Sequence, residues 1–135
     1  MANTFLRKTS KSVGIAVSDS TWWQVGANTA GASQTGGYKV TGSGKTTTVI
    51  GLSITNITGS SVDVDVAISN TGDGGGMGNI TYDISLASSV PIPSGSVLVL
   101  VGGDQKLNMV ENDLIKIKSS AANSLDVCMS VLEIT

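Results

Sequence analysis

The sequence predicts an all-β protein, an antiparallel β-sandwich of about eight strands with a jelly-roll-like order. Two observations carry this prediction. Apolar residues recur at every second position in several runs, as in strands with one buried face and one solvent-exposed face. The chain of 135 residues also contains 17 Gly and abundant Ser and Thr, and turn signals separate the runs at the spacing of a sandwich. We therefore expect almost no helix.

Four runs show the alternation most clearly. In chain order, three predicted buried faces are formed by Thr48, Ile50, Leu52 and Ile54, by Val62, Val64, Val66 and Ile68, and by Ile80, Tyr82, Ile84 and Leu86. The fourth run is Leu114–Lys118, which follows a predicted turn at Val110–Asp113. Shorter strands are predicted at 13–17, 22–25, 38–40, 97–101 and 106–110.

The last stretch, Ser124–Ile134, fits two structures. Helical spacing would align Leu125 with Cys128 or Met129 and then with Leu132, whereas period two aligns Leu125, Val127, Met129 and Val131. The β-branched residues, together with the strands predicted in the rest of the chain, favour a strand.

Two loops have distinctive compositions. Thr71–Gly78 contains five glycines and a single carboxylate, Asp73, whereas calcium needs about six or more oxygen ligands. We predict a mobile hairpin tip rather than a calcium site. Pro91–Gly95 is predicted to be a rigid turn, because proline fixes φ and cannot pair within a central strand.

The segment TGSGKTTT, residues 41–48, contains part of a nucleotide-binding loop. The full motif G-x-x-x-x-G-K-[ST] precedes a helix whose N-terminus faces the phosphate. Aligned on Gly44, Lys45 and Thr46, the motif has Lys39 in place of its first glycine, and the residues that follow are β-branched strand formers. We predict a turn between two strands, with Lys45 in solvent and no binding of ATP or GTP.

Composition argues against several function classes. The chain has no His, the commonest general base and metal ligand. Its one cysteine, Cys128, excludes an internal disulfide and a thiolate zinc cluster. The net charge of −2 gives no basic field for nucleic acid. The remaining carboxylate pairs, Asp63 with Asp65 and Glu111 with Asp113, suit a solvated strand face and a turn. We predict no catalysis, no cofactor and no metal.

No membrane association or secretion is expected either. No run approaches the roughly 18 apolar residues of a membrane span. The opening MANTFLRKTSKS lacks the apolar core of a secretory signal. We expect a soluble protein that folds where thiols stay reduced.

The chain is predicted to divide into an extended N-terminal arm, residues 1–12, and a sandwich domain, residues 13–135. Within the domain, Trp22 and Trp23 are adjacent on a predicted strand and must face opposite sides. One can sit in the core, so the other is a candidate interface anchor.

The arm carries the concentrated positive charge. Arg7, Lys8 and Lys11 are the only charged residues among the first 18, and Phe5 and Leu6 are the only bulky apolar residues of the arm. Two interpretations stay open. One is a frayed terminus. The other is a tether that lays Phe5 and Leu6 on a neighbouring protein while Arg7 and Lys8 meet acidic groups.

Several short segments give a family resemblance. The opening MANTF with Arg7 and Lys8 resembles the start of small virion structural proteins of marine and cyanobacterial tailed phages. The second half follows the same family pattern in order, through PIPSGS (91–96), GGDQKL (102–107), ND (112–113), SLDV (124–127) and LEIT (132–135). The resemblance covers both ends and most of the middle from Thr47, whereas residues 18–44 are peculiar to this chain. It implies a particle component and carries over no catalytic residue.

The resemblance does not decide which part of the particle; our first choice is a capsid decoration, or cement, protein that docks on the particle through its arm and stabilises it. Its partners would be other virion proteins, either the major capsid protein or neck and tail proteins, and it would itself form a homo-oligomer such as a trimer. Its location would be the virion, after synthesis in the host cytoplasm. The alternatives are a neck, collar, tail or fibre-attachment component and a carbohydrate-binding sandwich for host adhesion.

Overall fold

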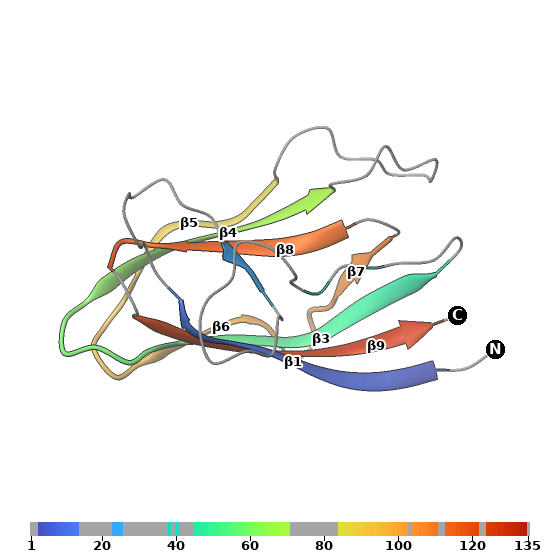
Figure 1. Cartoon of the computed structure of the whole chain (residues 1–135), viewed down its shortest axis with the longest axis horizontal. Helices are drawn as coiled ribbons and strands as arrows, with labels where there is room; N and C mark the ends of the chain where they lie inside the picture. Colours follow the sequence, from blue (N-terminus) through green and yellow to red (C-terminus); the bar gives the residue numbers. More distant parts are fainter. Residues whose placement is uncertain are drawn as a thin grey trace.

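Strands are the only regular elements in the part of the chain that the structure describes, residues 3–13, 23–25, 38, 40, 45–70, 84–102, 104–110, 113–121 and 124–134. In this computed structural model, the strands form two antiparallel sheets that face each other (Figure 1). The predicted all-β antiparallel sandwich is confirmed.

Sheet A contains β1 (Asn3–Val13), β9 (Leu125–Ile134), β3 (Thr46–Asn56) and β6 (Val97–Val101), in that order. The short β7 (Leu107–Met109) also pairs with β3, at an earlier part of that strand than β6 does. Because β9 occupies the other side of β3, β6 and β7 together resemble one interrupted strand.

Sheet B contains β2 (Trp23–Gln24), β8 (Asp113–Ser119), β4 (Val62–Asn70) and β5 (Ile84–Ile92), in that order. Strand partners are nested along the chain: β1 pairs with β9, β2 with β8, β3 with β6 and β7, and β4 with β5. The first part of the chain is therefore paired throughout with the second part.

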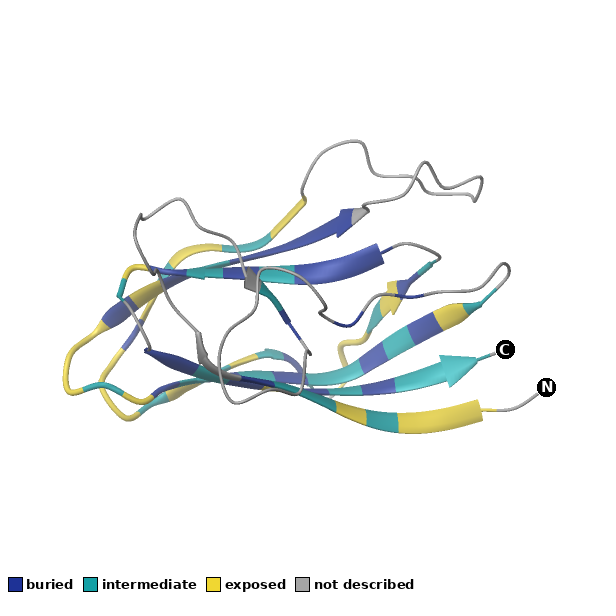
Figure 2. Cartoon of the chain, viewed as in Figure 1, coloured by how far each residue is buried: buried dark blue, intermediate teal, exposed yellow. Residues whose placement is uncertain are grey.

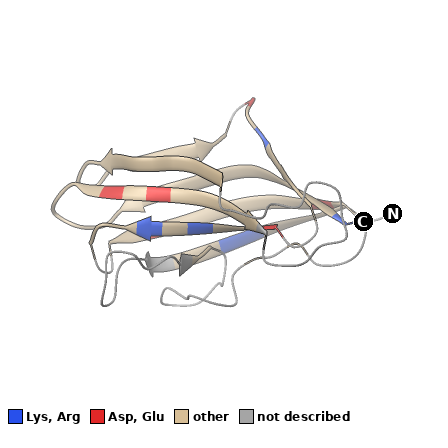
Figure 3. Ribbon diagram, turned by 90° about the horizontal axis from the view of Figure 1, so that it is seen from above, with Lys and Arg blue, Asp and Glu red and all other residues tan. Residues whose placement is uncertain are grey.

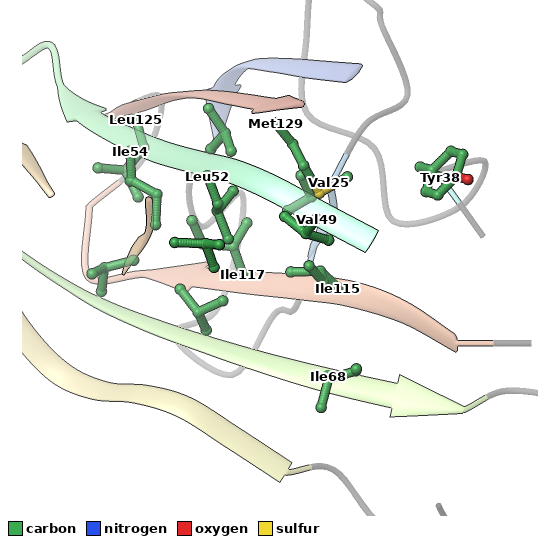
Figure 4. Packing of buried hydrophobic residues seen from close by; sticks show 14 of the residues in the cluster. Val25, Tyr38, Val49, Leu52, Ile54, Ile68, Ile115, Ile117, Leu125 and Met129 are labelled. Carbon is green, nitrogen blue, oxygen red and sulfur yellow. The ribbon is translucent and has the colours of Figure 1, made fainter. Parts of the chain in front are cut away.

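The core lies between the sheets and uses alternate residues of the central strands (Figures 2 and 4). Val49 and Leu52 of β3 point toward Ile115 and Ile117 of β8, and Met129 of β9 joins them (Figure 4). All five side chains are no more than 1% exposed. Burial of these aliphatic groups is the main stabilising contribution available to a sandwich of this size.

Alternation predicts β9 and the first part of β4 correctly, whereas Ala67 and Ser69 near the end of β4 are buried although they occupy the alternate positions predicted to face solvent. Val62, Val64 and Val66 are buried in β4, whereas Asp63 is exposed. The last stretch is a strand, as its β-branched residues suggested, with four alternate residues buried: Leu125, Val127, Met129 and Val131. Strands are also confirmed at β6 and β7, and the ends of the predicted turn before β8 are joined by a hydrogen bond from Asp113 N to Val110 O of 3.0 Å.

The buried face of β3 changes phase within the strand, which the sequence prediction missed. Val49 and Leu52 are both buried although they are three positions apart, and the register against β9 shifts between Val49 and Gly51. An extra residue in one strand, a β-bulge, moves the side chains that follow it to the opposite face. Thr48 and Ile50, predicted to be buried, are therefore half-exposed on the outer face.

The predicted turn at Pro91–Gly95 begins later than expected. Pro91 and Ile92 belong to β5, and the turn is closed by a hydrogen bond from Ser96 N to Pro93 O of 3.0 Å. Proline is tolerated here because β5 is the edge strand of sheet B. The same strand exposes 40% of Ile84, which was predicted to lie in a buried face with Leu86.

Tyr38 and Val40 are buried, but they lie outside any strand, contrary to the strand predicted at 38–40. Their backbone N–H groups donate to Val25 O (2.8 Å) and Asp113 O (3.1 Å).

A strand rather than a helix follows Lys45, as the β-branched residues there predicted. Predictions for residues 14–17, 41–44, 71–78 and 80–83 lie outside the described residues.

The N-terminal segment is part of the sandwich. A separate extended arm at residues 1–12 is not confirmed, because residues 3–13 form β1 and pair with β9 from Asn3 opposite Ile134 to Val13 opposite Leu125. Backbone hydrogen bonds hold an edge strand without the apolar alternation that the prediction required. The division of the chain at residue 13 therefore has no counterpart in the sheet.

Candidate interaction site

The candidate site is the outer side of β1, the edge strand of sheet A (Figures 1 and 2). Successive side chains of a strand point to opposite faces. Leu6 packs against the core, and Ser10 is 3% exposed, so the even-numbered residues face inward. Phe5 and Arg7 therefore face outward, and Phe5 is 71% exposed. Phe5 is the most exposed large apolar side chain among the described residues.

Lys8 is turned inward and is held by an aromatic ring. Its Nζ atom lies 5.3 Å from the centre of the Tyr38 ring, within the range of a cation–π contact. Of the predicted partner-binding residues, Leu6 and Lys8 thus serve the fold, and Phe5 and Arg7 face outward. The side chain of Lys11 lies outside the described residues.

A polar cluster anchors Tyr38 beneath β1. The Tyr38 hydroxyl donates to Glu133 Oε2 at 2.5 Å, and it lies 2.9 Å from Thr47 Oγ1, which can donate to it in turn. Burial raises the pKa of Tyr38 to about 12, the Glu133 carboxylate acts in the same direction, and the Thr47 hydrogen bond lowers it. Tyr38 stays neutral at physiological pH and joins β1, β3 and β9 at one end of the sandwich.

The outer face of sheet A carries little charge around Phe5 and Arg7. Phe5 lies opposite Leu132, and Arg7 lies opposite Ser130, on neighbouring β9. No carboxylate in the described part of the chain forms an ion pair with Arg7. The cationic side chain is therefore available to another molecule.

Sheet B differs, because its outer face carries charges of both signs side by side on β4 and β8 (Figure 3). Lys118 Nζ lies 3.8 Å from Asp65 Oδ2, and both side chains are partly exposed. Such surface pairs contribute about 0–1 kcal/mol. Lys118 and Asp65 are thus matched with each other on this face.

A shallow hollow of about 310 Å³ lies farther along the same face of sheet A. Its lining includes Thr9 of β1, Ser53 and Thr55 of β3, and Asp126 and Cys128 of β9. Four of its lining residues are Ser or Thr, although most of the lining surface is apolar, and the exposed Cys128 thiol has no disulfide partner. No group of three or more His, Cys, Asp or Glu residues suited to a metal ion occurs within the described ranges.

The sequence could not identify every exposed apolar residue. Val97 and Val99 of β6 are 52% and 61% exposed, but the run VLVLV has no polar residue that would mark its outer face.

Trp22 lies outside the described residues. Trp23 pairs with Ile117 through its backbone in β2, and its side chain is not described. Their proposed role as interface anchors stays a prediction.

Comparisons with known proteins add no relative. No protein-family model, curated protein or solved structure matches the chain. Within the described residues, no helix has the length and apolar character needed to cross a membrane.

Proposed function

We propose that the chain is a structural component of a phage particle, most simply a capsid decoration protein, and that the outer side of β1 is its docking site. The observation that carries the proposal is the exposure of Phe5 next to Arg7, which forms no ion pair with the described residues, on an edge strand. An exposed aromatic side chain beside an arginine is typical of the residues that dominate protein interfaces.

The architecture supports a structural role. Both sheets share one aliphatic core, so the sandwich can present a fixed surface to a neighbour. The nested strand partners and the strand orders of the two sheets support a jelly-roll topology, an arrangement found in viral capsid and lectin domains. The family resemblance of both chain ends supports the same assignment.

The decoration role differs from the neck, collar or tail role in copy number. A decoration protein contacts junctions between capsid subunits, so its copy number should scale with the number of those subunits. A neck or tail component should be present at the copy number of a single ring. We propose a homo-oligomer, such as a trimer, as the docking unit.

A reconstruction of the particle by cryo-electron microscopy, combined with quantification of this chain by mass spectrometry, tests the proposal. We expect density for the sandwich on the capsid exterior, with β1 facing a capsid subunit. We also expect particles that lack the chain to lose stability to heat. Absence of the chain from purified particles would refute the proposal, and density only at the neck or tail would favour the alternative.

A further inference from the structure

We infer that β1 accepts an extended acidic segment of a different protein as an additional strand of sheet A. The inference deepens the proposed function, since it states how β1 would dock and what chemistry the partner carries. It depends on the proposed function in one respect only: the acidic segment is taken to come from a protein of the phage particle.

The backbone of β1 is suited to strand addition. β1 has 11 residues, pairs with β9 on one side, and has no described strand on its other side. Its register is regular from Asn3 to Ser10 and shifts only between Ser10 and Val13. In an antiparallel pair, alternate residues direct their N–H and C=O groups away from the partner. An added strand can therefore use the outward-directed backbone groups of residues 3–8.

The other described edges are less suitable. β5 contains Pro91 and two register shifts, one on each side of Val66 in its partner strand, and Ser89 has a positive φ of 50°. β2 has 2 residues, and β6 has 5. Short, bulged or proline-containing edges are the usual means by which proteins prevent strand addition. β1 has neither a proline nor a bulge before Ser10.

Side chains on the outer face indicate the chemistry of the added strand. Directly opposite residues of paired strands lie about 5 Å apart, close enough to interact. A strand beside β1 would place one side chain next to exposed Phe5 and another, two positions along, next to Arg7. An apolar residue complements Phe5, and a carboxylate complements Arg7.

Charge also argues against a second copy of this chain as the occupant. β1 carries Arg7, Lys8 and Lys11 and no acidic residue. Antiparallel pairing of two β1 strands centred on residues 7–9 would bring these cations opposite or diagonal to one another, and like charges on paired strands are destabilising. An acidic segment removes this repulsion and gains attraction.

Hydrogen exchange on the isolated full-length chain tests the inference with a defined probe. The probe is a capped synthetic peptide of alternating Val and Asp, compared with a Val and Lys peptide of the same length. We expect the acidic peptide at low salt to slow exchange about tenfold at alternate amides of residues 3–8, and the basic peptide to have no effect. Equal effects of the two peptides, or protection only at β6 or sheet B, would overturn the inference.

Charge reversal supplies the specific control. In Arg7→Glu, we expect the preference to reverse, so that the basic peptide protects β1. Lys106→Glu makes the same change of charge at the exposed turn before β7, at the other edge of sheet A, and should keep the wild-type preference. An Arg7→Glu variant that still prefers the acidic peptide would contradict the assigned role of Arg7.

Rebinding to particles that lack this chain connects the inference to the proposed function. We expect Arg7→Glu and Phe5→Ala each to weaken binding about tenfold, and Lys106→Glu and Val99→Ala to leave it unchanged. If wild-type chain fails to rebind while the acidic peptide still pairs with β1, the virion assignment fails and strand addition stands. If all four variants rebind like wild type, strand addition fails and the virion assignment stands.

Discussion

Tyr38 shows how one buried hydroxyl can make stability depend on pH. Its pKa is raised to about 12 in the folded chain, against about 10 in an unfolded chain. The folded state therefore retains the phenolic proton between these values while the unfolded state loses it. The contribution of Tyr38 to stability is therefore fully present below pH 10 and is lost as pH rises toward 12.

We expect the free energy of unfolding to fall by about 1–2 kcal/mol over this interval, because solvent screens part of the interaction with half-buried Glu133. Urea unfolding at a series of pH values measures the fall. In a Tyr82→Phe background, ultraviolet titration should show Tyr38 ionising at lower pH after Glu133→Gln. Unchanged titration in that variant would contradict the assigned contribution of Glu133.

Asn56 is a buried amide whose hydrogen-bonding groups are all used. Its Nδ2 donates to Ser60 O (2.7 Å) and Ile92 O (2.8 Å), and its Oδ1 accepts from Thr58 N (2.9 Å) and Thr58 Oγ1 (2.7 Å). Asn56 is 1% exposed. The side chain therefore ties the turn after β3 to the end of β5.

Asn56→Asp should lower the free energy of unfolding by about 3 kcal/mol or more at neutral pH. An ionised carboxylate cannot donate, and it would face two carbonyl oxygens without solvent. Asn108→Asp is a matched control, because exposed Asn108 only accepts, from Thr48 Oγ1 at 2.9 Å, and should change stability by less than about 0.5 kcal/mol. Equal effects of both changes in chemical denaturation would contradict the role of the buried amide.

At the scale of single strands, alternation in β4 gives a direct mutational contrast. Val64 is 0% exposed, whereas neighbouring Asp63 is exposed. Val64→Asp should cost about 3–5 kcal/mol because it buries an unpaired charge, and Asp63→Ser should be nearly neutral. Thermal or urea unfolding measures both, and a tolerated Val64→Asp would refute the orientation of the strand.

Removal of residues 1–12 tests whether β1 belongs to the fold. Deletion would remove the Leu6 contact with the core, the Lys8 contact with Tyr38, and the backbone pairing with β9. We expect the free energy of unfolding to fall by about 2 kcal/mol or more. Phe5→Ala is the control, and it should change stability by less than about 0.5 kcal/mol, because Phe5 lies outside the core. A deletion variant as stable as wild type would restore the interpretation of a separate arm.

At the scale of the whole molecule, both sheets should unfold together. Their inner faces contribute to one cluster of buried residues, and small domains with a single core usually unfold in one cooperative step. Ile117→Ala in β8 should cost about 3 kcal/mol through loss of buried methyl groups and the cavity that remains. Hydrogen exchange should show that the amides of β3 in sheet A lose as much protection as those of β8 in sheet B. Loss confined to sheet B would show that the sheets open independently.

Much of this architecture was predictable because alternation reports burial directly. The buried valines of β4 and the strand at β9 follow from period two and β-branched residues, which are local properties. The β-bulge in β3 was not predictable from the same pattern. Ile50 is as apolar as its neighbours, and only the register against β9 shows that it points outward.

The candidate site was predictable in composition but not in geometry. Phe5 and Arg7 stand out as an aromatic residue and a cation in a segment without acids. Whether Phe5 and Arg7, rather than Leu6 and Lys8, point outward depends on which face of β1 meets the core. The position of Tyr38 was beyond any local pattern, because its partner Glu133 comes from a strand 95 residues away in the sequence.

By itself, the sequence determined the fold class, the main strands and the position of the charged N-terminal segment. These depend on side-chain period, rotamer freedom and charge, all of which are present in a short stretch of chain. Only the tertiary structure decided that this segment is the edge strand of sheet A and that it presents Phe5 and Arg7 outward. The physical reason is that edge pairing uses backbone groups, which every residue except proline carries alike, so the local sequence of this segment does not show that β9 is its neighbour in the sheet.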